Sequence, residues 1–237
     1  PVRRFQVGDP AIQYLDVLAG RTLDRLAALE HVAEKSEVIV GAEVADQLEV
    51  VAGPSRPVPG GAPAVVVAGP LAEGPATAWP PLEAAALMDR TVRSWLLPGV
   101  FERTRQGQFL AEIRPAVTLF LQFSGIHYDD DDGAWSKLDQ FVRWAQSVLD
   151  RYGGVLLQLT TGDKGSSFYG AFGAPVAHDD DAARAAAAAL ELRAPPDDLS
   201  FLSGVRIGLS QGRIWAGPYG GPTRRTYGVL GDEVNVA

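Results

Sequence analysis

The turn Gly162-Asp163-Lys164-Gly165 holds the residues best suited to chemistry in this sequence, because it sets a carboxylate and an ammonium group between two glycines. Glycine tolerates a positive φ and lets a backbone approach a ligand closely. Asp163 can therefore hold Mg²⁺, and Lys164 can hold a phosphate. Strand-like runs flank the turn on both sides, so the same residues also suit a plain hairpin with solvated charges. The spacing alone favours the hairpin.

Two acidic clusters offer further carboxylates, but neither has the spacing of a metal site. Residues 129–132 are four consecutive aspartates without the alternate positions and terminal glutamate of a calcium loop, which predicts a solvated loop. Residues 178–181 precede a helical pattern and are typical of a helix N-terminus. The three histidines, at positions 31, 127 and 178, show no metal-ligand spacing.

The composition excludes several classes of function. The 237 residues carry 21 Lys and Arg against 29 Asp and Glu, so the net charge is −8 and the pI about 4.9. This balance argues against nucleic-acid binding, which relies on cations that face phosphate. The absence of cysteine rules out disulfides, thiolate catalysis and cysteine-ligated metals.

The sequence also predicts where the protein is found. No apolar run approaches the roughly 20 residues of a membrane helix, and no signal segment opens the chain, so we expect no membrane segment and a cytoplasmic location. The chain starts at Pro1 and its single methionine is Met88. We interpret it as a segment of a longer protein.

The first of three compositional zones spans residues 1–52. Leucines spaced by three to five predict an amphipathic helix over residues 14–33, interrupted at Gly20. Residues 37–40 read as a short strand.

The second zone spans residues 53–113. Its first part, residues 53–81, is so rich in proline and glycine that it predicts a linker without helix or interior strand. Val65-Val66-Val67 is expected to form at most an edge strand, where proline nearby does least harm. A helical stretch interrupted at Pro98 follows over residues 82–105.

The third zone, from residue 114, has the clearest alternation of strands and helices. The expected order is strand 117–121, helix 135–152, strands 155–157 and 167–172, helix 181–192, and strands 205–210 and 212–216 around a short turn. The first strand is almost continuously apolar, as expected of a strand buried on both faces. The mixture predicts an α+β fold.

Read in order, the turns of this zone resemble the catalytic-homology domain of class III nucleotidyl cyclases. The matching pieces are Arg114-Pro115-Ala116-Val117-Thr118-Leu119-Phe120, Gly153-Gly154, Gly162-Asp163, Phe172-Gly173-Ala174-Pro175, Val205-Arg206-Ile207-Gly208, Tyr227-Gly228-Val229-Leu230-Gly231-Asp232 and Val234-Asn235. Each piece is weak singly, whereas the ordered series is specific and covers just over half of the chain. The resemblance implies the ferredoxin-like α+β cyclase fold.

The variant Asp163-Lys164-Gly165-Ser166-Ser167-Phe168 is similar to the second half of soluble-adenylyl-cyclase-like proteins, which carry two such domains in tandem. Residues 93–112 resemble the connector before that half. The stretch from Gly8-Asp9-Pro10 to Val40 resembles the end of the first half, which would explain a weak internal repeat between Arg3-Arg4 and Arg224-Arg225. The implied domains are the tail of a preceding cyclase domain (1–52), a linker with connecting helices (53–113), and a second cyclase domain without its C-terminal end (114–237).

The resemblance also implies a half that lacks its own metal pair. Class III cyclases hold two Mg²⁺ ions with two aspartates, which activate the ribose 3′-hydroxyl and steady the triphosphate. The first aspartate position falls on Gln122, whose neutral amide is a poor Mg²⁺ ligand, and the second falls on Asp163. We therefore expect Mg²⁺ or Mn²⁺ to be held mainly by a partner half.

The nucleotide-binding positions depart from the family pattern as well. The lysine that reads adenine falls on Gln158, and its acidic or threonine partner falls on Gly228, which has no side chain. Val229 falls where a backbone group contacts the base. Asn235 matches the catalytic asparagine that orients the ribose, and the arginine four residues further on would lie beyond Ala237.

The leading hypothesis is the metal-poor half of an adenylyl cyclase that converts ATP to cyclic AMP and diphosphate. Its partners would be ATP and a complementary cyclase half across a pseudo-twofold interface, in the same parent chain or as a dimer. The missing base-reading side chains leave open a catalytically inactive cyclase-fold module that regulates or scaffolds. An unrelated ferredoxin-like binding domain is the third possibility.

Overall fold

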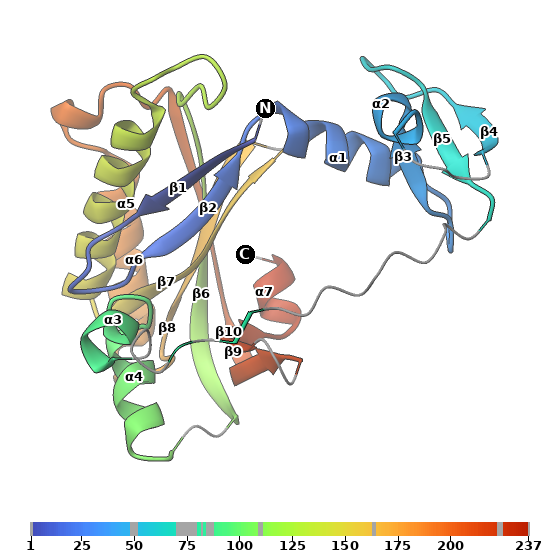
Figure 1. Cartoon of the computed structure of the whole chain (residues 1–237). Coiled ribbons are helices and arrows are strands. Elements are labelled where there is room, and N and C mark those ends of the chain that lie inside the picture. The colour runs from blue at the N-terminus through green and yellow to red at the C-terminus, as the bar shows by residue number, and fades with distance from the viewer. Residues whose placement is uncertain are drawn as a thin grey trace.

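The computed structural model describes residues 2–47, 52–69, 80–81, 83, 88–108, 111–162, 165–221 and 225–236. Within these residues the strands form antiparallel sheets of five, three and two strands, with helices packed against them (Figure 1). The expected α+β class is confirmed.

The five-stranded sheet is the frame of the molecule. Its spatial order is β10 (Arg225–Leu230), β9 (Gly204–Gly220), β6 (Glu112–Ser124), β8 (Gly165–Phe172) and β7 (Gly154–Gly162). The central strand β6 pairs with β8 on one side and with β9 on the other. The predicted strand 117–121 lies in the middle of β6 and is largely buried on both faces, as expected.

The predicted turn between residues 210 and 212 is wrong, because β9 runs without a break for 17 residues. Gly212 has a different use there. A Cβ at this position would collide with the side chain of Glu233 on helix α7 (Asp232–Val236). The glycine therefore permits close packing of a helix on the strand.

Two long helices cover one face of this sheet. They are α5 (Ala134–Arg151) and α6 (Asp181–Leu192), and both confirm the predicted helices to within a residue. Their apolar sides pack on the inward side chains of the strands in the main core. The core members from α5 and α6 are Ala134, Leu138, Phe141, Val142, Ala145, Val148, Leu149, Ala185, Ala188 and Leu192.

A smaller core lies on the opposite face, under α4 (Pro98–Arg105) and α7. The helical stretch predicted over residues 82–105 forms two short helices, α3 (Asp89–Arg93) and α4, with Pro98 in the first turn of α4. Positions 82 and 84–87 of that prediction lie outside the described residues. Every helix in the described part of the chain is too short or too polar to cross a membrane.

The predicted helix over residues 14–33 is half wrong. Its first part is strand β2 (Leu15–Ala19), and only after Gly20 does helix α1 (Arg21–Val32) begin. Gly20 has a φ of 120°, a backbone conformation that favours glycine, and the chain turns there between β2 and α1. Leucines at irregular spacing suggested a helix, whereas the alternating burial of β2 is that of a strand.

Strand β2 pairs with β1 (Arg3–Val7) in a hairpin that lies beside β7 and α5 (Figure 1). The inward side chains of this hairpin are Phe5, Val7, Val17 and Ala19, all buried in the main core with α5 and β6. Thr161 of β7 donates its hydroxyl hydrogen to the main-chain oxygen of Leu18 at 2.6 Å. The first 19 residues thus pack into the same core as the later sheet.

The three-stranded sheet has the order β3 (Ile39–Gly41), β5 (Ala64–Val67) and β4 (Ala52–Arg56) and lies beyond the end of α1 (Figure 1). The strand expected at 65–67 is present but is the middle strand, so the expected edge position is wrong. Strand β4 forms at the edge despite Pro54, and its register shifts there, so proline interrupts no regular ladder.

Candidate functional site

A cavity of about 500 Å³ lies between β7 and the far end of the β9–β10 hairpin. Its lining comes from four strands and comprises Leu15, Asp16, Val17, Leu157, Gln158, Leu159, Tyr219, Gly220, Thr226 and Tyr227. Strands β7 and β10 stand at opposite edges of the sheet, so the sheet order alone would keep them apart. They meet because β9 continues past its last pair with β6, Ala216 with Glu112, and its final residues pair only with β10.

Gln158 stands exposed on β7 at one wall of this cavity, opposite Tyr169 of β8 in the strand register. Its Nε2 donates to the hydroxyl of Thr160 at 3.3 Å. An amide side chain offers both a donor and an acceptor. The position where the family resemblance places a base-reading group therefore faces open space and keeps hydrogen-bonding capacity.

Gly228 is buried under an aromatic ring. A Cβ built on it would stand 2.5 Å from Cε1 of Tyr219 and 3.3 Å from the hydroxyl oxygen of Tyr169. Real Cβ atoms do not make contacts under 3.0 Å, so no other residue fits here while Tyr219 keeps its place. The glycine is a packing requirement of the hairpin.

The side chain of Val229 points into the smaller core. Its side chain is 1% exposed in the smaller core, and the residue pairs with Ala216 in the β9–β10 ladder. Gln158 therefore lines the cavity, whereas Val229 does not.

Asn235 stands exposed on α7 and does not line this cavity. The helix that carries it is fixed to the sheet by Glu233. The hydroxyl of Ser210 donates to Glu233 Oε2 at 2.6 Å, and the hydroxyl of Thr118 donates to the Glu233 main-chain oxygen at 3.0 Å. The structure therefore holds Asn235 on a firmly docked helix without bringing it to Gln158.

Gln122 lies on β6 between Ser167 of β8 and Arg206 of β9. It is close to the β7–β8 hairpin, since a Cβ on Gly165 would lie 3.7 Å from Gln122 Nε2. Asp163, the second predicted metal position, is outside the described residues. Among the described residues no three His, Asp or Glu side chains gather to hold a metal ion. The neutral Gln122 amide does not fit a two-carboxylate Mg²⁺ site.

The second face of the sheet is only partly covered by helices. Beyond α4 and α7 it carries half-buried and exposed side chains, which are Phe120, Gln122, Gln158, Thr160, Ser167, Tyr169 and Arg206. The rings of Phe120 and Tyr169 stack at 5.4 Å with an angle of 19°. Polar and aromatic groups on an open sheet face are typical of a surface that another structure covers.

The four aspartates at 129–132 form a more ordered loop than the solvated one expected. Both carboxylate oxygens of Asp129 accept the main-chain N–H of Arg21, at 3.1 and 3.0 Å, and so bind the start of α1. Asp131 accepts the Lys137 ammonium at 2.7 Å and the Gly133 main-chain N–H at the same distance, which together lower its pKa. The loop therefore holds α5 and the tail segment (residues 1–52) in place.

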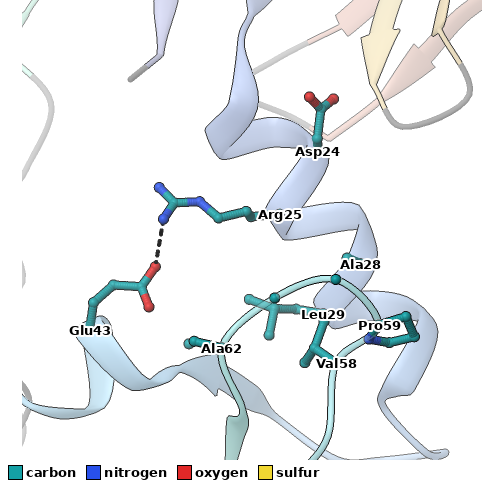
Figure 2. Close-up of a pocket in the computed structure, with 11 residues that line it drawn as sticks. Asp24, Arg25, Ala28, Leu29, Glu43, Val58, Pro59 and Ala62 are labelled. Carbon is teal, nitrogen blue, oxygen red and sulfur yellow. Dashed lines mark hydrogen bonds and ion pairs between the residues drawn. The ribbon is translucent and has the colours of Figure 1, made fainter.

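A separate cavity of about 270 Å³ lies between α1 and the loop before β5. Figure 2 shows Leu29 and Val58 on its apolar side, with Arg25 reaching Glu43 at 3.2 Å. None of the residues singled out from the sequence lines it.

Two residues of the larger cavity escaped sequence reasoning. Tyr219 sits in the glycine-rich run Gly217-Pro218-Tyr219-Gly220-Gly221, which reads as a turn, and only the hairpin register sets it over Gly228. Asp16 comes from the tail segment, which no local pattern ties to Gln158. Arg4 Nε forms an ion pair with Asp16 Oδ1 at 2.7 Å.

No protein-family model matches the chain. A curated relative, adenylate cyclase type 10 of Rattus norvegicus, is 26% identical over 151 residues, or 63% of this chain. The match spans 9% of that relative's length.

Solved structures show a similar fold. A bacterial light-regulated adenylyl cyclase superposes with a TM-score of 0.51 at 17% identity, over 62% of this chain and 46% of that one. The guanylyl cyclase Cya2 covers 53% of this chain and 68% of its own, with a TM-score of 0.47 at 24% identity. The adenylyl cyclase CyaB from P. aeruginosa covers 54% and 71%, with a TM-score of 0.45 at 20% identity.

Proposed function

Because the later part of this chain is a class III nucleotidyl cyclase-homology domain, we propose that it forms one half of an adenylyl cyclase, which converts ATP to cyclic AMP and diphosphate. The observation that carries this proposal is the sequence match to adenylate cyclase type 10. The preference for ATP over GTP is proposed from that match alone, because a fold by itself does not fix the substrate. A cytoplasmic location, where ATP is at hand, belongs to the same proposal.

The chain would supply the half of the site that holds the nucleotide rather than the metal. Gln122 is an amide, so the carboxylates for Mg²⁺ or Mn²⁺ would come mainly from a complementary half. That half would cover the open sheet face around Phe120, Gln122 and Arg206. On that face Gln158, which lines the cavity, would meet the base together with Gly228 and Val229 of β10. Asp163, which lies outside the described residues, belongs to the same proposed set.

Asn235 is the catalytic residue we assign to this chain. Its amide would hydrogen-bond the ribose and so align the 3′-hydroxyl with the α-phosphorus, which favours the transition state through orientation. Because Asn235 stands apart from the Gln158 cavity, closure of the two halves would have to bring both side chains onto one nucleotide.

The test is complementation. The chain is mixed with the metal-bearing half of a class III cyclase, and cyclic AMP is measured with Mg²⁺ or Mn²⁺. We expect no product from the chain alone, product from the mixture, and a loss of roughly 100-fold or more with Asn235→Ala. Turnover by the isolated chain above the Asn235→Ala control would contradict the half-site role.

A second candidate function is a catalytically inactive module. It is favoured by the ring of Tyr219, which fills the space that a base-reading side chain at position 228 would need. A cyclase fold that regulates or scaffolds a larger protein needs no such side chain. Calorimetry with ATP and the complementary half separates the two. Micromolar binding that Asn235→Ala abolishes supports the cyclase half, whereas no binding in the mixture supports the scaffold.

A further inference from the structure

The ring of Tyr219 occupies the volume that a side chain at position 228 would need. The distance from a Cβ on Gly228 is 2.5 Å to Tyr219 Cε1 and 3.3 Å to Cζ, so the ring covers the glycine edge-on and in contact. Gly228 pairs with Gly217, and Tyr219 pairs with Thr226, which places ring and glycine on the same side of the hairpin. Gly228 therefore leaves room for this ring, whereas a Cβ on its pair Gly217 would meet Ala111 instead.

Tyr219 is held from behind by other aromatic residues. Its hydroxyl is hydrogen-bonded to the hydroxyl of Tyr169, whose ring in turn stacks on Phe120 at 5.4 Å. Burial, and after it this hydrogen bond, raise the pKa of Tyr169, so Tyr169 keeps its proton at neutral pH and either hydroxyl can be the donor. In the arrangement that suits a ligand in the cavity, Tyr169 donates to the Tyr219 oxygen. A phenol has one hydrogen to donate, and that of Tyr219 is then left to point elsewhere.

The cavity in front of this ring has complementary chemistry. Tyr219 and Tyr227 line it on the hairpin side, Gln158 lines it on the β7 side, and the Asp16 carboxylate closes it from the tail segment. Its volume of about 500 Å³ is in the range of small-molecule sites. An aromatic wall with an amide and a carboxylate opposite suits a flat heteroaromatic ring that carries an amino group.

We propose that Tyr219 is the base-binding residue of this domain and takes the role of the side chain that Gly228 lacks. The ring packs against the plane or edge of the purine, and its hydroxyl donates to a ring nitrogen. Gln158 and Asp16 accept the exocyclic amine. This inference rests on the proposed function, because it specifies how that same site would hold its nucleotide.

The experiment measures ATP and GTP affinity by calorimetry for the chain mixed with a metal-bearing cyclase half. Stacking of a base on an aromatic side chain predicts roughly a 10-fold or greater weakening for Tyr219→Ala, and a smaller one for Tyr219→Phe, which keeps the ring. Tyr152→Phe is the matched control, since Tyr152 donates to Glu191 at 3.1 Å away from the cavity. Inorganic triphosphate, which has no base, should bind equally to all of these proteins.

Gly228→Thr provides a second route to the same answer. A side chain there displaces the Tyr219 ring, so the single variant should bind as weakly as Tyr219→Ala. In the double variant Tyr219→Ala with Gly228→Thr the side chain has room, and affinity should recover above that of either single change. If circular dichroism shows that Tyr219→Ala is unfolded, the affinities of Tyr219→Phe and Gly228→Thr still test the role of Tyr219.

The outcomes separate this inference from the function on which it rests. Wild-type binding that all the Tyr219 and Gly228 variants retain overturns the role of Tyr219 and leaves the cyclase half intact. An equal loss of nucleotide and of triphosphate assigns Tyr219 a structural role and also overturns the inference. No binding of either nucleotide by the wild-type mixture overturns both proposals.

Discussion

Gln146, in the middle of helix α5, donates its Nε2 hydrogen to the main-chain oxygen of Gln13 at 2.8 Å, across 133 residues of sequence. Its Oε1 accepts the main-chain N–H of Asp9 at 2.8 Å. The side chain is 2% exposed, and its two part-buried hydrogen bonds fix the connection between β1 and β2. A single buried amide thereby ties the tail segment to the later domain.

Gln146→Leu should destabilise the chain by about 2–4 kcal/mol. The leucine removes both hydrogen bonds and leaves the part-buried N–H of Asp9 and C=O of Gln13 without this partner. Chemical denaturation measures the change. Gln140→Leu, on the exposed side of the same helix, should change the unfolding free energy by less than about 0.5 kcal/mol. Equal losses of unfolding free energy in the two variants would show that the Gln146 hydrogen bonds do not stabilise the chain.

Phe5→Ala should cost about 3–5 kcal/mol, as expected for an aromatic side chain in a continuous core. Phe5 is 3% exposed and packs with the same cluster as α5. Leu18→Ala on the same hairpin is the control, because Leu18 is 48% exposed and should lose less than about 1 kcal/mol. Hydrogen exchange of α5 amides should accelerate in Phe5→Ala only. If α5 keeps its protection, the hairpin is a separate folding unit.

Gly212→Ala should loosen helix α7 while the sheet stays folded. The added methyl collides with the Glu233 side chain, which must give up the hydroxyl of Ser210. We expect a local cost of roughly 1–2 kcal/mol and faster exchange of the amides at 232–236. The matched control is Gly221→Ala, where a Cβ meets nothing within 4 Å. Because α7 carries Asn235, Gly212→Ala should also lower cyclic AMP formation in the complementation assay. Unchanged cyclic AMP formation would show that the packing of α7 on β9 does not position Asn235.

The free energy of unfolding should fall in alkaline solution, because Tyr128 is buried as a neutral phenol. Burial raises the pKa of Tyr128 from 10.0 to about 12, outweighing the opposing hydrogen bond to Ser166 at 2.7 Å. The folded state therefore favours the neutral phenol, and this contribution is complete below pH 10 and is lost as the pH rises toward 12. The loss from Tyr128 is at most about 2–3 kcal/mol.

Chemical denaturation at about pH 9, 10 and 11 measures how steeply the unfolding free energy falls with pH. Burial also raises the pKa of Tyr227 to about 12, so part of the slope remains in Tyr128→Phe. The variant should nevertheless show a shallower decline than the wild type. A decline of equal steepness in both proteins would show that Tyr128 does not carry the effect.

Periodicity was sufficient for the parts of the fold whose contacts are local. Helices α5 and α6 have one apolar side each and end at predictable residues, with Gly153 at a φ of 76° just after α5. The order of glycine-rich turns then indicated the cyclase fold. Strand β10 has no alternation of apolar and polar residues around Gly228, so its sequence does not predict a strand. It forms by antiparallel pairing with β9.

The remainder depended on contacts between distant segments. Strand β2 reads as a helix because its leucines fit either period, and burial of Val17 and Ala19 against α5 decides for a strand. Gly228 reads as a loss of function in sequence, whereas in space it makes room for Tyr219. Neither outcome follows from neighbours within one turn or one strand.

The buried hairpin also sets an order of events during synthesis. Residues 3–19 are made before α5, and Asp9 meets Gln146 only after 137 further residues are made. At ordinary elongation rates this interval is on the order of ten seconds. During that time Phe5, Val7 and Val17 lack the side chains of α5 and β6 with which they are buried, and closing so long a loop is slow. The hairpin is thus made early and buried late, which exposes it to chaperones and to misassociation with other nascent chains.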